Sequence, residues 1–249
     1  MVHHSTKRSA IAVVVTMALT GCGGGSGGLG GGGLGGSNTT APPAGSYDLH
    51  AATAALVKSG LSVNVNLSGT AIANGTSNSF TGSGTWTLSA GANGTFNGLT
   101  AETQTETITG TVTVAGQSAP YTSTVVNAYD STAAFLGESS SSEFDVASAP
   151  ITIPTTVGTT ATELGTLSRY KDSTRSVVLG TTQVSVVLSL AAASTGAAEV
   201  VEFTYKVYDS NQALVETDTF SYNLSESSAL TLNSATVQNA SGSLTATPQ

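Results

Sequence analysis

The feature that most constrains the fold is an alternation of apolar and polar residues, which begins at residue 61 and recurs to the end of the chain. In segment 200–208, for example, Val201, Phe203 and Tyr205 alternate with more polar residues. Successive side chains of a β-strand point to opposite faces, so a period of two predicts strands with one buried face. The pattern predicts strands at 61–67, 80–89, 103–115, 121–129, near Phe144, and at 177–191, 200–208, 213–224, 230–237 and 243–247.

Short, turn-forming connections separate these strands. Asn74-Gly75 and Asn93-Gly94 are tight-turn signals, and Gly116-Gln117 is expected to join two strands as a hairpin. Strands joined in this way pair with their sequence neighbours. The sequence therefore predicts an all-β fold, an antiparallel meander of about ten or eleven strands. A barrel, a strongly curved sheet and a sandwich all remain open.

One short helix is expected before the first strand, at 48–59. Asp48 can cap its N-terminus, and Leu49, Ala52 and Leu56 share one face at helical spacing. Gly60 suits the position just after the last turn. We expect this helix to cover one end of the sheet.

The first 21 residues have the composition of an export signal. Lys7 and Arg8 are followed by an apolar run over residues 10–19. A run of about 10 residues is too short for a hydrocarbon core, which needs about 20, but it fits the apolar region of a signal peptide. Thr20 and Gly21 then lead to Cys22, the single cysteine of the chain.

The segment Leu19-Thr20-Gly21-Cys22 resembles the lipobox of bacterial lipoproteins. The resemblance implies cleavage between Gly21 and Cys22, a diacylglyceryl thioether on Cys22 and a further acyl chain, such as palmitate, on its amine. Two or three acyl chains hold a protein stably on a bilayer. Gly23, rather than Asp, follows the cysteine. In Gram-negative lipoproteins this favours export to the outer membrane, which is therefore the location that the resemblance implies. The periplasmic face and the cell surface both remain open.

The lipidated cysteine opens a Gly-rich flexible linker at 22–45, and a β-rich globular region follows at 46–249. A Ser-rich stretch at 137–162, which contains two prolines, leaves open a division into two sub-lobes. The linker, the helix and the meander together resemble uncharacterised outer-membrane lipoproteins of Gram-negative bacteria, over most of residues 46–249. That group carries no activity to transfer.

The charge of the mature chain argues against nucleic acid as a partner. All fifteen carboxylates follow Cys22, against five basic residues, which gives a formal charge of −10. Phosphate backbones are bound by clustered Lys and Arg side chains. We therefore expect no nucleic-acid partner. The membrane, reached through the lipid anchor, is the partner that the sequence predicts, and an additional protein or lipid partner remains open.

Catalytic and metal-binding patterns are incomplete. His50 is the single histidine left after processing, which excludes the usual Cys/His zinc site. The segment around Ser118 lacks the final small residue of a nucleophile elbow, and Ser168 with Lys171 lacks the other elements of a penicillin-binding enzyme. We expect no enzyme activity, no cofactor and no metal site.

Two groups of charged residues carry weaker hypotheses. Carboxylates at even spacing, Glu102 with Glu106 and Glu216 with Asp218, fit a solvated strand face better than a cation site or a glycosidase pair. Arg169, Lys171 and Arg175 gather within seven positions. They fit an exposed turn, with a contact patch for lipid phosphates or an acidic partner as the functional alternative.

The leading functional hypothesis is therefore a membrane-anchored, non-catalytic β-domain for interaction or structure. The alternative is a carrier, in which a barrel or curved sheet holds a lipid or another small hydrophobic ligand.

Overall fold

The computed structural model describes residues 48–73, 75–189, 199–225 and 227–249. The predicted signal peptide, Cys22 and the predicted linker lie outside these residues. The described part is all-β apart from one helix, α2 (Leu49–Ser59). Its strands are β1 (Leu61–Ala73), β2 (Thr76–Leu88), β3 (Ala92–Phe96), β4 (Leu99–Val114), β5 (Gln117–Tyr129), β6 (Phe135–Ser139), β7 (Phe144–Ile151), β8 (Thr162–Tyr170), β9 (Val178–Ser189), β10 (Glu199–Asp209), β11 (Leu214–Leu224), β12 (Leu230–Asn239) and β13 (Gly242–Pro248).

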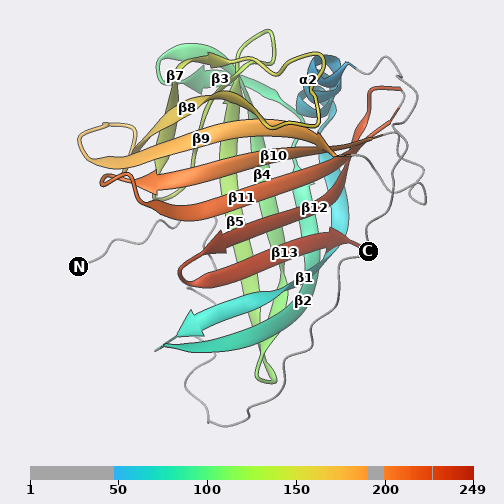
Figure 1. The fold of residues 1–249 in the computed structure, drawn as a ribbon, viewed down its shortest axis with the longest axis vertical. Helices are drawn as coiled ribbons and strands as arrows, with labels where there is room; N and C mark the ends of the chain where they lie inside the picture. Colours follow the sequence, from blue (N-terminus) through green and yellow to red (C-terminus); the bar gives the residue numbers. More distant parts are fainter. Residues whose placement is uncertain (1–47, 74, 190–198, 226) are drawn as a thin grey trace.

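The strands form a closed antiparallel barrel (Figure 1). From β4 to β13 each strand pairs with the next one along the chain, and β13 pairs with β1. Pairing of β2 with β4, over Phe80↔Val114 to Leu88↔Glu106, completes a ring of twelve strands. β3 lies outside this ring and pairs with the first residues of β4. The all-β antiparallel fold is confirmed, and of the three open architectures it is the barrel.

Closure leaves the polar face outside and the apolar face inside. In β10, Val201 and Val207 are fully buried, and in β1 Val65 and Leu67 are buried as well. The residues between them face outward, where Ser, Thr and Asn prevail. The predicted alternation therefore describes the inner and outer surfaces of one barrel. The sequence left open a division into two sub-lobes at 137–162. Strands β6 and β7, which lie in or next to this region, continue the same sheet.

Helix α2 covers one end of the barrel, as expected. The Asp48 side chain accepts a hydrogen bond from the Ala51 N–H at 2.8 Å, and Gly60 ends the helix with φ of 70°. At the same end, the Leu49 N–H donates to the Thr155 carbonyl at 2.9 Å. No helix in the described part of the chain is both long enough and apolar enough to cross a bilayer.

The β3–β4 hairpin packs against the outside of the barrel wall. Phe96 of β3 stacks on Phe144 of β7 with ring centroids 4.8 Å apart, in a small cluster that includes Leu136. The tight turn predicted at Asn93-Gly94 is wrong, because these residues lie within β3. The chain turns instead at Asn97 and Gly98, both with positive φ.

Candidate functional site

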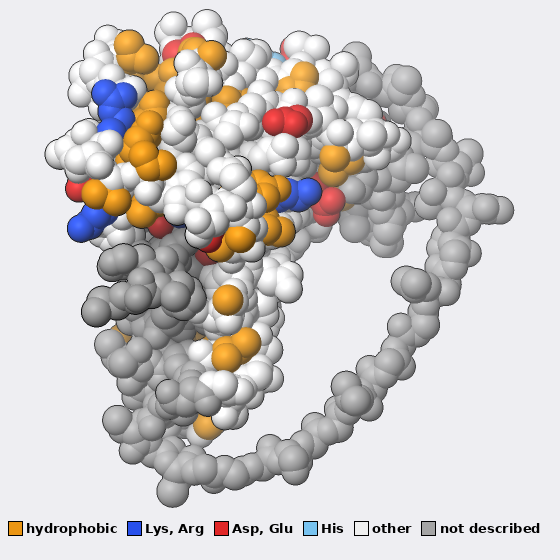
Figure 2. Space-filling model, turned by 60° about the vertical axis from the view of Figure 1, so that its left-hand side comes forward, with side chains coloured by type: hydrophobic (Ala, Val, Ile, Leu, Met, Phe, Trp, Pro, Cys, Tyr) orange, Lys and Arg blue, Asp and Glu red, His pale blue; other side chains and the backbone are white. Residues whose placement is uncertain are grey.

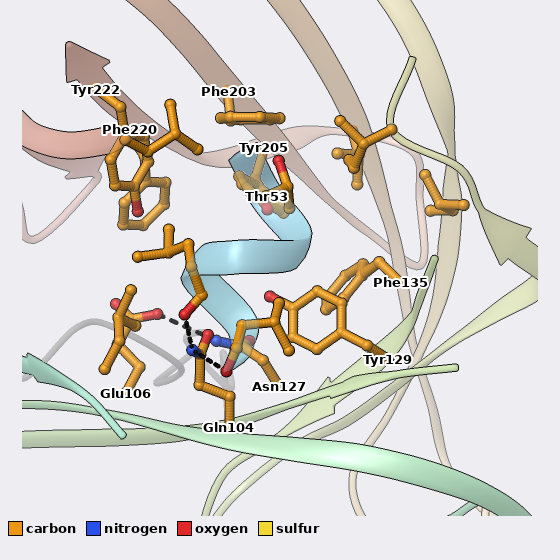
Figure 3. Close-up of a pocket in the computed structure, with 17 residues that line it drawn as sticks. Thr53, Gln104, Glu106, Asn127, Tyr129, Phe135, Phe203, Tyr205, Phe220 and Tyr222 are labelled. Atoms are coloured by element: carbon orange, nitrogen blue, oxygen red, sulfur yellow. Dashed lines mark hydrogen bonds between the residues drawn. The ribbon is translucent and has the colours of Figure 1, made fainter. Parts of the chain in front are cut away.

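A cavity of about 80 Å³ lies inside the barrel, next to α2 (Figure 3). The helix forms one wall with Thr53, Leu56 and Val57, and inward-facing side chains of the strands form the rest. Aliphatic residues such as Val184 complete the lining. The cavity thus depends on two features of the sequence. One is the helix with its capping residues, and the other is the alternation that directs the apolar side chains of the strands into the barrel.

Gln104 of β4 holds α2 in place. Its Nε2 donates to the Leu56 carbonyl at 3.0 Å and to the Val57 carbonyl at 3.3 Å. The Gly91 N–H also donates to the Val57 carbonyl, at 2.8 Å. The Val57 carbonyl is one of the last helical carbonyls, which have no partner within a helix, and the Leu56 carbonyl accepts the Gly60 N–H as well. These bonds fix the helix as one wall of the cavity.

Six aromatic side chains surround the cavity. The ring of Tyr205 meets that of Phe220 edge-on, with centroids 5.7 Å apart and planes at 89°. Phe220 in turn lies 5.6 Å from Trp86, the single tryptophan of the chain. The six that line the cavity are Tyr129, Phe135, Phe203, Tyr205, Phe220 and Tyr222.

A few polar groups accompany the aromatic rings, as Figure 3 shows. Asn127 Nδ2 donates a long hydrogen bond of 3.4 Å to Glu106 Oε2. The Thr53 Oγ1 atom is buried and has no hydrogen-bond partner among the described residues. An apolar cavity with a small number of convergent polar groups is the usual form of a small-molecule site.

A second, smaller cavity of about 20 Å³ adjoins the first. Glu106 and Phe220 line both cavities, and Trp86 lines the second. A void that holds one water needs about 10–15 Å³. The second cavity is therefore large enough for one water molecule beside Glu106.

Tyr129 reports on the electrostatic character of the cavity. Burial raises the pKa of its phenol well above the ordinary value, and the nearby Tyr205, Tyr222, Glu106 and Glu138 raise it further. Each of these neighbours is an acid that carries a negative charge once it loses its proton. The surroundings of the cavity therefore oppose additional negative charge.

Among the buried charged side chains of the described residues, negative groups outnumber positive ones. Among the described residues, Arg169 is the one buried base, and it donates to Glu143 Oε2 at 2.8 Å, with its Nε 3.8 Å from Asp145 Oδ2. Six carboxylates are buried with it: Glu106, Glu138, Glu143, Asp145, Glu216 and Asp218. The prediction of a solvated face for Glu216 and Asp218 is wrong, because they share the inward parity of Phe220.

The predicted basic patch is only partly assembled. Arg169 is 2% exposed and points inward, so its inclusion in a surface patch is wrong. It shares the inward parity of Leu167, a signal that the sequence contains. Lys171 and Arg175 do lie exposed, in the loop between β8 and β9. Gly21 and Cys22 lie outside the described residues.

The residues considered for catalysis lie apart. His50 is on α2, where its Nδ1–H donates to the Ile153 carbonyl at 3.1 Å. Ser118 is in the β4–β5 hairpin at the other end of the barrel, hydrogen-bonded to Thr113 at 2.8 Å. Within the described ranges, no group of three or more His, Cys, Asp or Glu side chains is arranged to hold a metal ion.

Comparison with known proteins adds little. No family model matches the chain, and no curated protein matches it. Among solved structures, the crystal structure of a DUF1329 family protein from Desulfovibrio piger is similar, with a TM-score of 0.28 and 10% identity, over 80% of this chain and 88% of that one. A similarity at this level supports no inference about function.

Proposed function

We propose that this chain is a non-catalytic lipoprotein, held at the outer membrane through Cys22, whose barrel binds a small and mainly apolar molecule. The observation that carries the binding proposal is the cavity beside α2, with its six aromatic rings and few polar groups. This is the carrier alternative of the sequence analysis. It is a narrower form of the non-catalytic domain that the sequence favours.

The size of the cavity limits the ligand. Sites for drug-sized molecules have volumes of about 300–1,000 Å³, whereas this one has about 80 Å³. The occupant is therefore a compact group or part of a slender chain. Thr53 offers it a hydroxyl that no described residue uses.

Native mass spectrometry of the mature protein, released from a non-ionic detergent, tests the binding proposal. We expect a bound small molecule on the wild type. Val184→Phe, which fills the cavity, should remove that mass, because Val184 lines the site. Val187→Phe is the matched control, since Val187 faces the other side of β9 and does not line the cavity. An adduct of equal abundance on Val184→Phe would place the ligand elsewhere, and bare wild-type protein would refute the binding proposal.

The anchor has its own test. Labelled palmitate should enter the wild-type chain and be absent from Cys22→Ser, and the variant should leave the membrane fraction because the acyl chains are its attachment. A Cys22→Ser protein that still sediments with membranes would refute the lipid anchor.

Protease treatment of intact cells separates the two faces of the outer membrane. Cleavage within 22–45 on intact cells would place the barrel at the surface. Protection until the outer membrane is permeabilised would place it in the periplasm.

A second candidate function, contact with a surface or partner, is favoured by a patch at the end of the barrel opposite α2. There, Val177, Val178 and Leu214 are exposed by about half, on hairpins of neighbouring strands, and Lys171 and Arg175 lie in the same β8–β9 loop. Figure 2, viewed from this side, shows basic side chains next to hydrophobic ones. If the patch contacts lipid phosphates, Lys171→Glu with Arg175→Glu should abolish co-sedimentation of the unlipidated Cys22→Ser protein with phosphatidylglycerol vesicles. Unchanged co-sedimentation would exclude that contact.

A further inference from the structure

We propose that the cavity selects a small organic cation, such as a quaternary ammonium group, over neutral and anionic molecules of the same shape. This inference rests on the proposed binding function and names the ligand class. Three observations support it: the aromatic walls, the carboxylate among them, and the absence of Lys and Arg from the described residues that line the cavity.

The aromatic walls are the first support. The faces of Tyr and Phe rings carry partial negative charge and attract cations placed within about 6 Å of the ring centre. Aromatic cages that bind quaternary ammonium ligands use this attraction. Here six rings line one cavity of about 80 Å³, so a compact group inside it lies close to several rings at once. Tyr205, Phe220 and Tyr222 come from two adjacent strands, which places them on the same wall.

The second support is Glu106, which lies among these rings (Figure 3). Its Oε2 accepts a hydrogen bond from Asn127, and both side chains line the cavity. A carboxylate in surroundings of low dielectric constant interacts strongly with a cation that enters them. The rings already favour a cation over a neutral group, and Glu106 strengthens that preference.

The third support is the absence of basic side chains from the described lining of the cavity. Lys58, Lys171, Arg175 and Lys206 are exposed, and the one buried base of the described residues, Arg169, is paired with Glu143 and Asp145. No Lys or Arg lines the cavity, so nothing among the described residues offers an anionic head group a salt bridge there. A fatty-acid carboxylate is therefore a poor ligand.

Three probes of nearly equal shape separate charge from size: choline, 3,3-dimethylbutan-1-ol and 3,3-dimethylbutanoate. Isothermal titration calorimetry of the mature protein should give an association constant for choline about ten-fold or more above that of the neutral alcohol, a difference of the size that cation–π contacts supply. The carboxylate should bind more weakly than the alcohol. If the alcohol binds as tightly as choline, or the carboxylate binds best, the cation inference is overturned while the binding barrel stands. If none of the three binds, the cation inference fails, and native mass spectrometry of the wild type then decides the proposed function separately.

Two pairs of variants, each a test with its control, assign the preference to the residues named. Glu106→Gln keeps the size of the side chain and should bring choline to within about three-fold of the alcohol, while Glu163→Gln, an exposed carboxylate on β8, should leave the preference intact. Tyr205→Phe keeps a ring and should bind choline as the wild type does, whereas Tyr205→Leu should lose about ten-fold. Near-ultraviolet circular dichroism confirms that each variant is folded. A folded Glu106→Gln with undiminished choline preference would overturn the role of Glu106, and with it the inference.

Discussion

Replacement of Arg169 by Met tests the buried charge network inside the barrel. The guanidinium lies 2.8 Å from Glu143 Oε2 and 3.8 Å from Asp145 Oδ2, and its Nη1 donates to the Tyr208 carbonyl at 3.1 Å. The three side chains are 2% exposed or less. The substitution retains most of the apolar stem but leaves two buried carboxylates without their counter-charge.

Loss of one partner from a buried ion pair destabilises a protein by about 3–5 kcal/mol. That is a large share of a total stability of about 5–15 kcal/mol. The free energy of unfolding, measured by urea titration with Trp86 emission as the probe, should fall by this amount. The control Arg175→Met, at an exposed loop position, should change it by less than about 0.5 kcal/mol.

A triple variant checks the cause. Arg169→Met combined with Glu143→Gln and Asp145→Asn removes the two uncompensated charges and should recover part of the lost stability. A loss below about 1 kcal/mol for Arg169→Met would refute the account of this network. So would a triple variant that is less stable than Arg169→Met alone.

Three further changes test the helix and the cavity. Asp48→Ala removes the N-cap of α2 and should lower the free energy of unfolding by about 1 kcal/mol in urea titration, and no change would show that the cap is dispensable. Gly60→Ala forces a side chain into φ of 70° and against the Leu88 carbonyl, which should cost about 1–2 kcal/mol or more; a wild-type urea midpoint would contradict it. Tyr129 has a folded pKa above its unfolded one, so its contribution to stability is complete below about pH 10 and falls as the pH rises toward the folded pKa. Tyr129→Phe should therefore show a shallower alkaline loss of stability than the wild type, and equal slopes would contradict the raised pKa.

The parts of the fold that follow from local signals could be predicted from the sequence. Helix α2 has its cap residue, its apolar face and its terminal glycine within 13 positions, and all three act as expected. Strands β10 and β11 show their inner face largely in every second residue, which is the face that closure buries, whereas in β12 a bulge in the pairing with β11 shifts the buried positions from Leu230 and Leu232 to Ala235 and Val237. A β-branched or aromatic residue at alternate positions has few other stable arrangements.

Closure and the polar interior could not be predicted in the same way. Pairing of β2 with β4 is decided by the shape of the whole sheet, and no residue near Phe80 or Val114 marks it. The strands β3, β6 and β8 are short or interrupted by bulges, so their alternation is weak. A charged side chain predicts the solvated face for Glu106. That prediction is wrong, because Glu106 lies an even number of residues from the buried Val112 and therefore faces inward with it.

The residues of the candidate site could be predicted from the sequence only in part. Phe203 and Tyr205 were placed on one apolar face from the sequence, and they do line the cavity. That they meet Tyr129 and Glu106 could not be predicted, because these residues come from strands on another part of the ring. Only the closed barrel brings them together.

Trp86 offers the most direct measurement of ligand binding inside the barrel. It is the single tryptophan, is 1% exposed, and lies 5.6 Å from Phe220 of the cavity wall. We expect (2-bromoethyl)trimethylammonium, whose bromine quenches tryptophan emission at short range, to quench Trp86 along a saturable curve in the wild type, with saturation lost in Val184→Phe and retained in Val187→Phe. Quenching that rises linearly without saturation, or that is the same in all three proteins, would contradict a binding site within this barrel.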